Sequence, residues 1–198
     1  MRIRNREHYV ISDWAGGRTT QIAIMPPAAV YGERDFLWRV SSATVERAES
    51  DFTPLPDYDR QILLLDGSIR LSHSGGPALW LEPYRVHTFD GGEATRSWGR
   101  CRDFNLMLRK GKSSGRLRPL ILPDHGTAEL RFEGPIREDL PRRSLLLYCA
   151  AGEIMVERAG ERRCLRAEES AWIEDGEGPA VRLTAQAPSA LIAAEVQY

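Results

Sequence analysis

Prolines and glycines divide this chain into short apolar segments, and their spacing constrains the fold more than any other sequence feature. The 198 residues include 12 prolines and 17 glycines. The segments between them are apolar either continuously or at every second residue, as is typical of β-strands. Prolines such as Pro54, Pro56 and Pro123 break up any long helix. The pattern predicts an all-β fold with few short helices.

The expected strands are spread along the whole chain. They cover residues 21–25, 36–45, 60–65, 68–72, 86–89, 104–108, 145–149, 153–158 and 190–196. A helical turn is expected at 43–49 or at 136–140. No segment has the pattern of a dinucleotide-binding βαβ unit or a phosphate-binding loop.

Two parts of the sequence share one layout of strand, glycine turn, strand and acidic-glycine turn. Gly67 aligns with Gly152, and Asp90-Gly91-Gly92 aligns with Glu174-Asp175-Gly176. Such a repeat predicts a duplicated double-stranded β-helix, that is, a bicupin of the RmlC-like jelly-roll type. We expect residues 1–198 to form a single bicupin unit. Its halves would be an N-terminal barrel over 1–112 and a C-terminal barrel over 113–198, with exchange of strands between them left open.

Charge and cysteine content favour a cytoplasmic protein. The net charge of −1 creates no general field that attracts nucleic acid or anionic lipid, so we expect neither as a partner. The polar N-terminus lacks the apolar core of a signal peptide, and no apolar run approaches the length of a membrane span. Three cysteines without a CxxC pair fit reduced thiols. The strong preference for Arg over Lys is typical of a bacterial genome rich in G and C.

The histidines do not have the spacing of a metal centre. A metal-binding cupin needs a His-x-His pair with a carboxylate and a further His. The four histidines here are His8, His73, His87 and His125, and no two of them are two residues apart. His73 and His87 lie in the first repeat, where they could face each other. We therefore expect no metal and no cofactor.

Two strands carry polar residues on one face and apolar residues on the other. Alternation places Arg39 and Ser41 together on the first strand, and Asp103 and Asn105 together on the second. If these faces line a barrel interior, an Arg can bind a carboxylate and the Ser and Asn side chains can orient the ligand. The alternatives are a solvated sheet face or a purely structural Arg39–Asp103 ion pair.

Two further segments could contribute to the same pocket. Trp14 and Thr19 flank a glycine pair that lets backbone approach a ligand closely, although a tight turn with a packed Trp explains the pattern equally well. Arg60 follows a proline-fixed loop and could act as a second anion-binding group.

Four segments resemble, in order, those of the HutD/Ves family of bicupin-like proteins. They are residues 14–22, 36–45, 52–60 with the Gly67 turn beyond, and 103–111, and they cover the chain from about 10 to 111. The resemblance implies a duplicated cupin fold without the usual metal ligands. It also implies, for members encoded with histidine-utilisation enzymes, binding or control of a histidine-breakdown intermediate. Other members are named for stress induction, and no established enzymatic activity comes with the family.

Two hypotheses for the function remain. The first is a metal-free binding protein for a small anionic metabolite. Separately, we expect a homodimer formed through edge strands. The second is a metal-independent isomerase or hydrolase that acts on a small amino-acid-derived substrate, with Asp103 as general base. A general base needs a raised pKa, and we expect a flanking Arg to lower the pKa of Asp103 instead. Binding is therefore favoured over catalysis.

Overall fold

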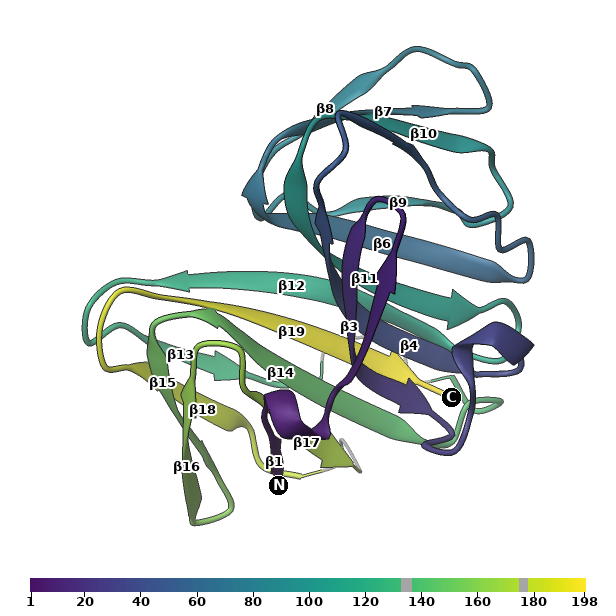
Figure 1. Cartoon of the computed structure of the whole chain (residues 1–198). Coiled ribbons are helices and arrows are strands. Elements are labelled where there is room, and N and C mark those ends of the chain that lie inside the picture. The colour runs from purple at the N-terminus through teal and green to yellow at the C-terminus, as the bar shows by residue number, and fades with distance from the viewer. Residues whose placement is uncertain (133–136, 175–177) are drawn as a thin grey trace. The chain divides into compact units, whose positions relative to one another are not determined.

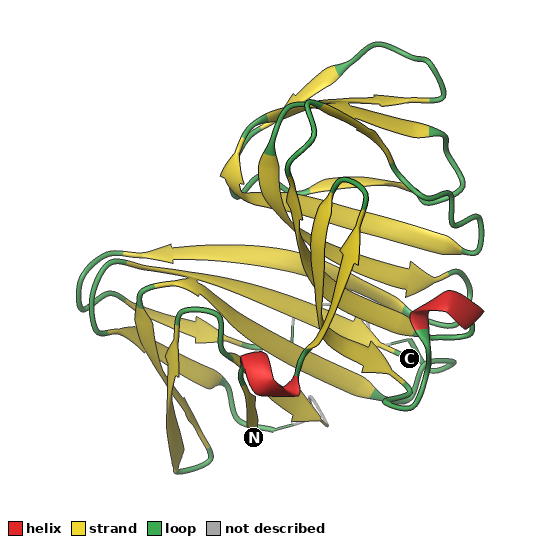
Figure 2. Ribbon diagram, in the orientation of Figure 1, coloured by secondary structure: helices red, strands yellow, loops and turns green. Residues whose placement is uncertain are grey.

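Antiparallel β-strands form almost all of the regular structure in the computed structural model of the chain (Figure 2). The structure describes residues 1–132, 137–174 and 178–198. Within these ranges the helices are two 3₁₀ turns, η1 (Arg6–His8) and η2 (Tyr31–Glu33). The predicted all-β fold with few short helices is confirmed.

The chain divides into two compact units. The N-terminal unit comprises Tyr9–Ser114, and the C-terminal unit comprises Met1–His8 together with Gly115–Tyr198. The first eight residues therefore belong to the unit built by the second half of the chain. They reach it through the short strand β1 (Arg2–Arg4), which pairs with β17 (Ser170–Glu174).

Two antiparallel sheets build the N-terminal unit (Figure 1). The larger has the order β2 (Val10–Trp14), β3 (Gly17–Met25), β4 (Trp38–Val45), β11 (Cys101–Arg109), β6 (Tyr58–Gly67) and β9 (His87–Asp90). The smaller has the order β5 (Glu49–Asp51), β10 (Thr95–Trp98), β7 (Ile69–His73) and β8 (Leu79–Leu81). One apolar cluster, which includes Ile62, Leu71 and Phe89, draws its members from both sheets and holds them together.

The C-terminal unit also consists of two antiparallel sheets (Figure 1). One has the order β1, β17, β14 (Arg143–Ala151), β19 (Ser189–Gln197) and β12 (Ser114–Leu122). The other has the order β13 (Thr127–Leu130), β18 (Val181–Ala185), β15 (Glu153–Arg158) and β16 (Glu161–Arg166). Its core includes Leu147, Ile154 and Leu183, which are fully buried.

All nine expected strands overlap an observed strand, so these predictions are confirmed. The helical turn expected at 43–49 is wrong: β4 continues to Val45, and β5 starts at Glu49. Pairing with β11 and β10 holds this segment extended and overrides its local helix preference. The alternative turn at 136–140 starts outside the described residues, and so does the Asp175-Gly176 part of the second acidic-glycine turn.

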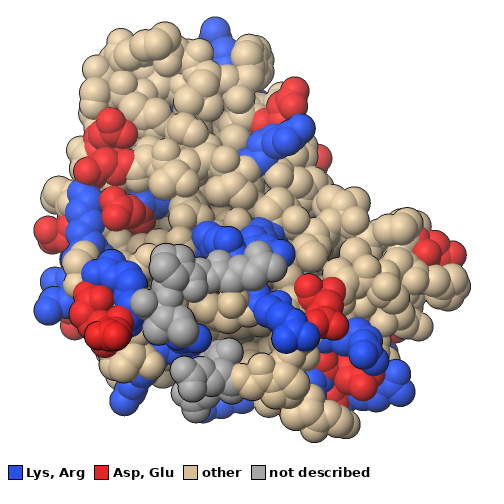
Figure 3. Space-filling model, turned by 180° about the vertical axis from the view of Figure 1, so that it is seen from behind, with Lys and Arg blue, Asp and Glu red and all other residues tan. Residues whose placement is uncertain are grey.

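Three further features concern the surface charges, the cysteines and the question of a membrane-spanning helix. Acidic and basic side chains lie next to one another on the face seen in Figure 3. Cys101, Cys149 and Cys164 are all free thiols. Among the described residues, no helix has the length and apolar character needed to cross a bilayer.

The two aligned glycine turns adopt the same backbone conformation, and this leads to a stability prediction. Gly67 has φ +80° and Gly152 has φ +81°, both in the left-handed region. A Cβ on Gly67 would collide with the Arg100 carbonyl oxygen, and one on Gly152 would collide with Ser189. We expect Gly67→Ala and Gly152→Ala each to destabilise the protein by about 2–4 kcal/mol, because strain and overlap add.

Gly75→Ala is the matched control, since Gly75 has φ +72° but open space around its Cα. It should cost only about 1 kcal/mol, from backbone strain alone. Urea unfolding of the three variants measures the differences. Equal losses at Gly67 and Gly75 would contradict the assigned collision.

Candidate functional site

The register of three neighbouring strands gathers the polar residues of the N-terminal unit on one sheet face. Met107 on β11 pairs with Arg39 on β4 and with Arg60 on β6, so the two arginines lie on either side of it. Two residues along β11, Asn105 pairs with Ser41 on β4. Strand alternation places all five side chains on the same face.

This face borders a cavity of about 260 Å³ within the N-terminal unit. Every residue that the sequence singled out for binding lines it, namely Trp14, Thr19, Arg39, Ser41, Arg60, Asp103 and Asn105. The strand face is therefore neither an outer solvated face nor closed over by apolar packing. Trp14 remains 41% exposed, whereas Arg39, Ser41, Arg60, Asp103 and Asn105 are all buried.

Arg39 is fixed in place by three neighbours. Its Nε donates to Gln21 Oε1 at 2.8 Å, and its Nη1 donates to Ser41 Oγ at 3.0 Å. The guanidinium also lies over the Tyr31 ring, 4.1 Å from the ring centroid. Burial lowers the pKa of Arg39 to about 10, so the group stays charged at neutral pH. Its Nη2 is the nitrogen without an assigned acceptor in the described structure.

Arg60 is held by aromatic rings rather than by hydrogen bonds. Its guanidinium carbon lies 5.1 Å from the ring centroid of Phe52 and 5.1 Å from that of Phe89. Arg60 is 6% exposed, and its Nε has no hydrogen-bond partner among the described residues. Burial is the main cause that lowers the pKa of Arg60, and the Asp103 carboxylate partly offsets it.

Asp103 is buried without an ion pair in the described part of the chain. Its Oδ1 accepts a hydrogen bond from the Ala43 backbone N–H at 3.3 Å, and Arg39 and Arg60 act on it only at longer range. Burial raises the pKa of Asp103 to about 7, although both arginines and the Ala43 N–H lower it. The expectation that a flanking Arg would lower this pKa overall is therefore wrong, because desolvation outweighs the attraction. The structural Arg39–Asp103 ion pair is not formed.

Asn105 is the second buried acceptor on β11. It is 4% exposed, and its Oδ1 has no donor among the described groups. An unpaired buried acceptor costs about 1–3 kcal/mol unless a ligand or water satisfies it. Among the described residues, one buried donor, Arg60 Nε, and one buried acceptor, Asn105 Oδ1, are thus left without a partner on the same sheet face.

Sequence patterns alone did not single out several residues that shape this site. Gln21, Tyr31, Phe52 and Phe89 hold the two arginines, and Met107 lies between them. Alternation along β11 does place Met107 on the face of Asp103 and Asn105, but it does not show that the two arginines lie on either side of Met107. No local sequence pattern indicates that Phe52 and Phe89 contact Arg60. The contacts form because the loop after β5 and strand β9 pack beside β6 in the folded unit.

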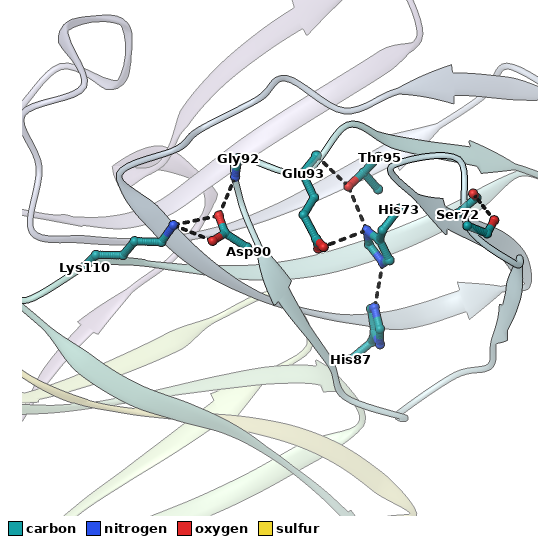
Figure 4. A network of polar contacts seen from close by, with 9 residues as sticks. Ser72, His73, His87, Asp90, Gly92, Glu93, Thr95 and Lys110 are labelled. Carbon is teal, nitrogen blue, oxygen red and sulfur yellow. Dashed lines mark hydrogen bonds and ion pairs between the residues drawn. The ribbon is translucent and has the colours of Figure 1, made fainter.

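A separate polar network joins His73 and His87 in the same unit (Figure 4). The Thr95 hydroxyl donates to the Glu93 carbonyl at 3.1 Å, so its oxygen accepts from His73 Nδ1 at 2.9 Å. His73 Nε2 is then the acceptor for His87 Nε2–H, at 2.8 Å. The two histidines therefore face each other as a neutral, hydrogen-bonded pair.

The cavity is a poor site for a divalent metal. It offers two carboxylates, Asp51 and Asp103, and no imidazole, while Arg39 and Arg60 would repel a cation. No cluster of three or more His, Cys, Asp or Glu side chains suited to a metal occurs in the described residues. The donor set suits an anion.

Comparison with known proteins gives both a family and a fold. The family model described as HutD matches residues 6–193. A search of curated proteins finds no match. Among solved structures, the conserved protein PA5104 of unknown function from Pseudomonas aeruginosa has 25% identity and a TM-score of 0.81, covering 100% of this chain and 98% of that one.

Two further structures extend the likeness. HutD from Pseudomonas fluorescens SBW25, solved in a formate condition, has 22% identity and a TM-score of 0.71, covering 100% of this chain and 98% of that one. The pirin YhhW from Escherichia coli, also solved with nickel(II), has 8% identity and a TM-score of 0.70, covering 98% and 97%. Such likeness at low identity shows the fold, which is cupin-like.

Replacing Asp103 should change how stability depends on pH. The folded state binds a proton at this carboxyl up to about pH 7, whereas an ordinary Asp releases it near 3.8. Stability therefore falls as pH rises from about 4 to 7, by on the order of 4 kcal/mol. We expect Asp103→Asn to gain stability relative to the natural protein across this window and to level off above it.

Urea unfolding at pH 5, 6.5 and 8 measures this difference. Asp59→Asn, a change at an exposed position on β6, is the control and should show no such trend. A constant difference between Asp103→Asn and the natural protein at all three pH values would contradict the raised pKa.

The histidine pair should act in the opposite pH direction. Burial lowers the pKa of both His73 and His87, and His73 lowers that of His87 further. The unfolded chain takes up protons near pH 6.5 that the folded pair resists, so this pair loses stability as pH falls through that value. We expect His87→Gln to flatten the decline in thermal midpoint between pH 7 and 5. His125→Gln, at an exposed position, should leave it unchanged.

Proposed function

Because this chain belongs to the HutD family, we propose that it is a metal-free binding protein for a small carboxylate metabolite. The cavity of the N-terminal unit is the proposed site. The observation that carries the proposal is Arg60, whose buried guanidinium lies against the rings of Phe52 and Phe89 and whose Nε has no acceptor among the described residues.

A carboxylate would relieve the cost of burying these charges. A guanidinium removed from water costs several kcal/mol unless an anion or acceptors compensate it. Arg60 presents its planar N–H edge for a charge-assisted hydrogen bond. Arg39 adds a second positive charge, with Gln21 and Ser41 already fixing two of its nitrogens. The ligand would therefore bind between β4 and β6, across Met107.

The family suggests a biological setting for this binding. We propose that the bound metabolite reports on histidine catabolism, so that the protein regulates that pathway, or that it serves a stress response as in the Ves-named members. The free thiols Cys101, Cys149 and Cys164 support a cytoplasmic location, because such locations keep cysteines reduced.

We also infer that the cupin-like fold arose by duplication of one jelly roll. Gly67 and Gly152, aligned by sequence, share a left-handed conformation in equivalent turns. Each unit has a pair of antiparallel sheets around an apolar core. These features support a bicupin architecture.

A metal-independent isomerase or hydrolase acting on a small amino-acid-derived substrate is the second candidate. The raised pKa of Asp103, about 7, favours it, since a general base works best near the operating pH. Asp103 lines the same cavity as Arg39 and Arg60, so a substrate held by the arginines would lie beside it.

A thermal-shift screen tests the binding proposal. The probes are histidine, urocanate, formiminoglutamate, N-formylglutamate and glutamate, each with and without EDTA. A ligand at ~100 times its Kd stabilises the folded state by about 2.7 kcal/mol, which raises the midpoint by roughly 5–10 °C. We expect such a shift for at least one probe, unaffected by EDTA and lost in Arg60→Gln.

Arg85→Gln, at an exposed position of the same unit, is the control and should keep the full shift. No shift with any probe would contradict carboxylate binding. A shift that EDTA abolishes would contradict the metal-free site.

A further inference from the structure

The rings of His73 and His87 lie end to end in the N-terminal unit (Figure 4). Their Nε2 atoms are 2.8 Å apart, their ring centroids are 5.0 Å apart, and the ring planes are inclined by 23°. The two Nε2 atoms therefore point at one shared position. Neither histidine is among the described residues that line the cavity, so the pair is separate from the proposed binding site.

His73 is held in the orientation and tautomer that a metal ligand needs. Its Nδ1–H donates to the Thr95 hydroxyl at 2.9 Å, and that hydroxyl donates onward to the Glu93 carbonyl at 3.1 Å. The Glu93 carboxylate lies 3.9 Å from the same Nδ1. Histidines that bind a metal almost always donate their second ring N–H to an oxygen acceptor in this way. His73 Nε2 thus presents its lone pair towards His87.

The surroundings of the pair favour a cation that water can deliver. Glu93 attracts positive charge at His73 more strongly than Arg60 repels it, and Glu93 acts on His87 as well. The His73 side chain is 15% exposed, and His87 is half-buried, so ions in solution can reach both rings. Imidazole nitrogens suit zinc, copper and nickel ions.

A small movement would open the pair enough to admit an ion. Two Zn–N bonds of about 2.0–2.1 Å at a tetrahedral angle separate their nitrogens by about 3.4 Å. The Nε2 atoms are now 2.8 Å apart, so they must part by about 0.6 Å. His87 lies on β9, an edge strand of the larger sheet, and makes no other side-chain hydrogen bond among the described residues. Its ring can therefore move while Thr95 holds His73.

We propose that His73 and His87 form a binding site for one divalent transition-metal ion of the zinc type. The two Nε2 atoms bind the ion, and water completes its coordination. The N–H proton of His87 moves from Nε2 to Nδ1, so both rings stay neutral and each Nε2 offers a lone pair. The ion would join β7 of the smaller sheet to β9 of the larger sheet. This site is additional to the metal-free cavity and does not depend on it.

Isothermal titration with ZnSO₄ tests the proposal on the full chain at pH 7.5, after treatment with EDTA and dialysis. We expect the natural protein to bind one ion per chain. His87→Gln removes one of the two ligands and should weaken Kd at least about 100-fold, because even the loss of a partner behind a ligand costs about 10- to 100-fold. His125→Gln, at an exposed position of the C-terminal unit, is the control and should leave Kd unchanged.

A substitution behind the ligand tests how His73 is positioned. Thr95→Val replaces the hydroxyl by a methyl group of similar shape and frees His73 Nδ1. We expect one ion still to bind, with Kd weakened about 10-fold. An unchanged Kd in Thr95→Val would overturn the orienting role of Thr95.

Electron paramagnetic resonance of the chain loaded with one equivalent of Cu²⁺ counts the bound nitrogens directly. We expect coupling to two nitrogens in the natural protein and in His125→Gln, and to one nitrogen in His87→Gln. The count does not depend on affinity, so a modest loss of stability in a variant does not imitate the result.

The outcomes also separate this site from the proposed function. Failure of the natural protein to bind zinc would overturn the site. Binding that persists unchanged in both His73→Gln and His87→Gln would place the ion on other groups and overturn it as well. Neither result affects carboxylate binding at Arg60, which the thermal-shift screen tests independently.

Discussion

Antiparallel pairing of β11 with β4 and β6 is the constraint on which the site depends. Phe104 and Leu106 on one face of β11 are fully buried, while Asp103 and Asn105 on the other face are buried beside a cavity. A strand buried on both faces cannot leave polar side chains to solvent, so its neighbours must provide for them. Arg39 and Arg60, which flank Met107, attract the Asp103 carboxylate at long range. Arg60 Nε and Asn105 Oδ1 have no hydrogen-bond partner among the described residues.

Burial then decides the electrostatics of the cavity. Desolvation is the first cause of the pKa shift at Arg39, Arg60 and Asp103, ahead of the attraction between them. Charges held this way are poised to gain from a ligand, because an anion restores the interactions that water would have supplied. The contact with the aromatic rings matters for the same reason, because Phe52 and Phe89 pack against the Arg60 guanidinium without accepting hydrogen bonds from its N–H groups.

Phe89 also links the cavity wall to the histidine pair. One guanidinium, that of Arg60, lies 5.1 Å from its ring centroid, and the His73 ring lies 4.8 Å from it. Burial lowers the pKa of both His73 and His87 and so favours their neutral state, while the Thr95 hydrogen bonds set which ring nitrogen of His73 donates. The Phe89 ring is therefore packed against both the cavity wall and the histidine pair.

The sequence by itself determined the strand pattern and the faces. Period-two alternation placed Arg39 with Ser41 and Asp103 with Asn105, because side-chain direction along a strand depends only on local geometry. The tertiary structure decided how these groups behave. The raised pKa of Asp103, the aromatic contacts of Arg60 and the unpaired oxygen of Asn105 all depend on burial and on residues distant in the chain. Contacts between such residues leave no local pattern, so only the folded arrangement of strands and loops could fix them.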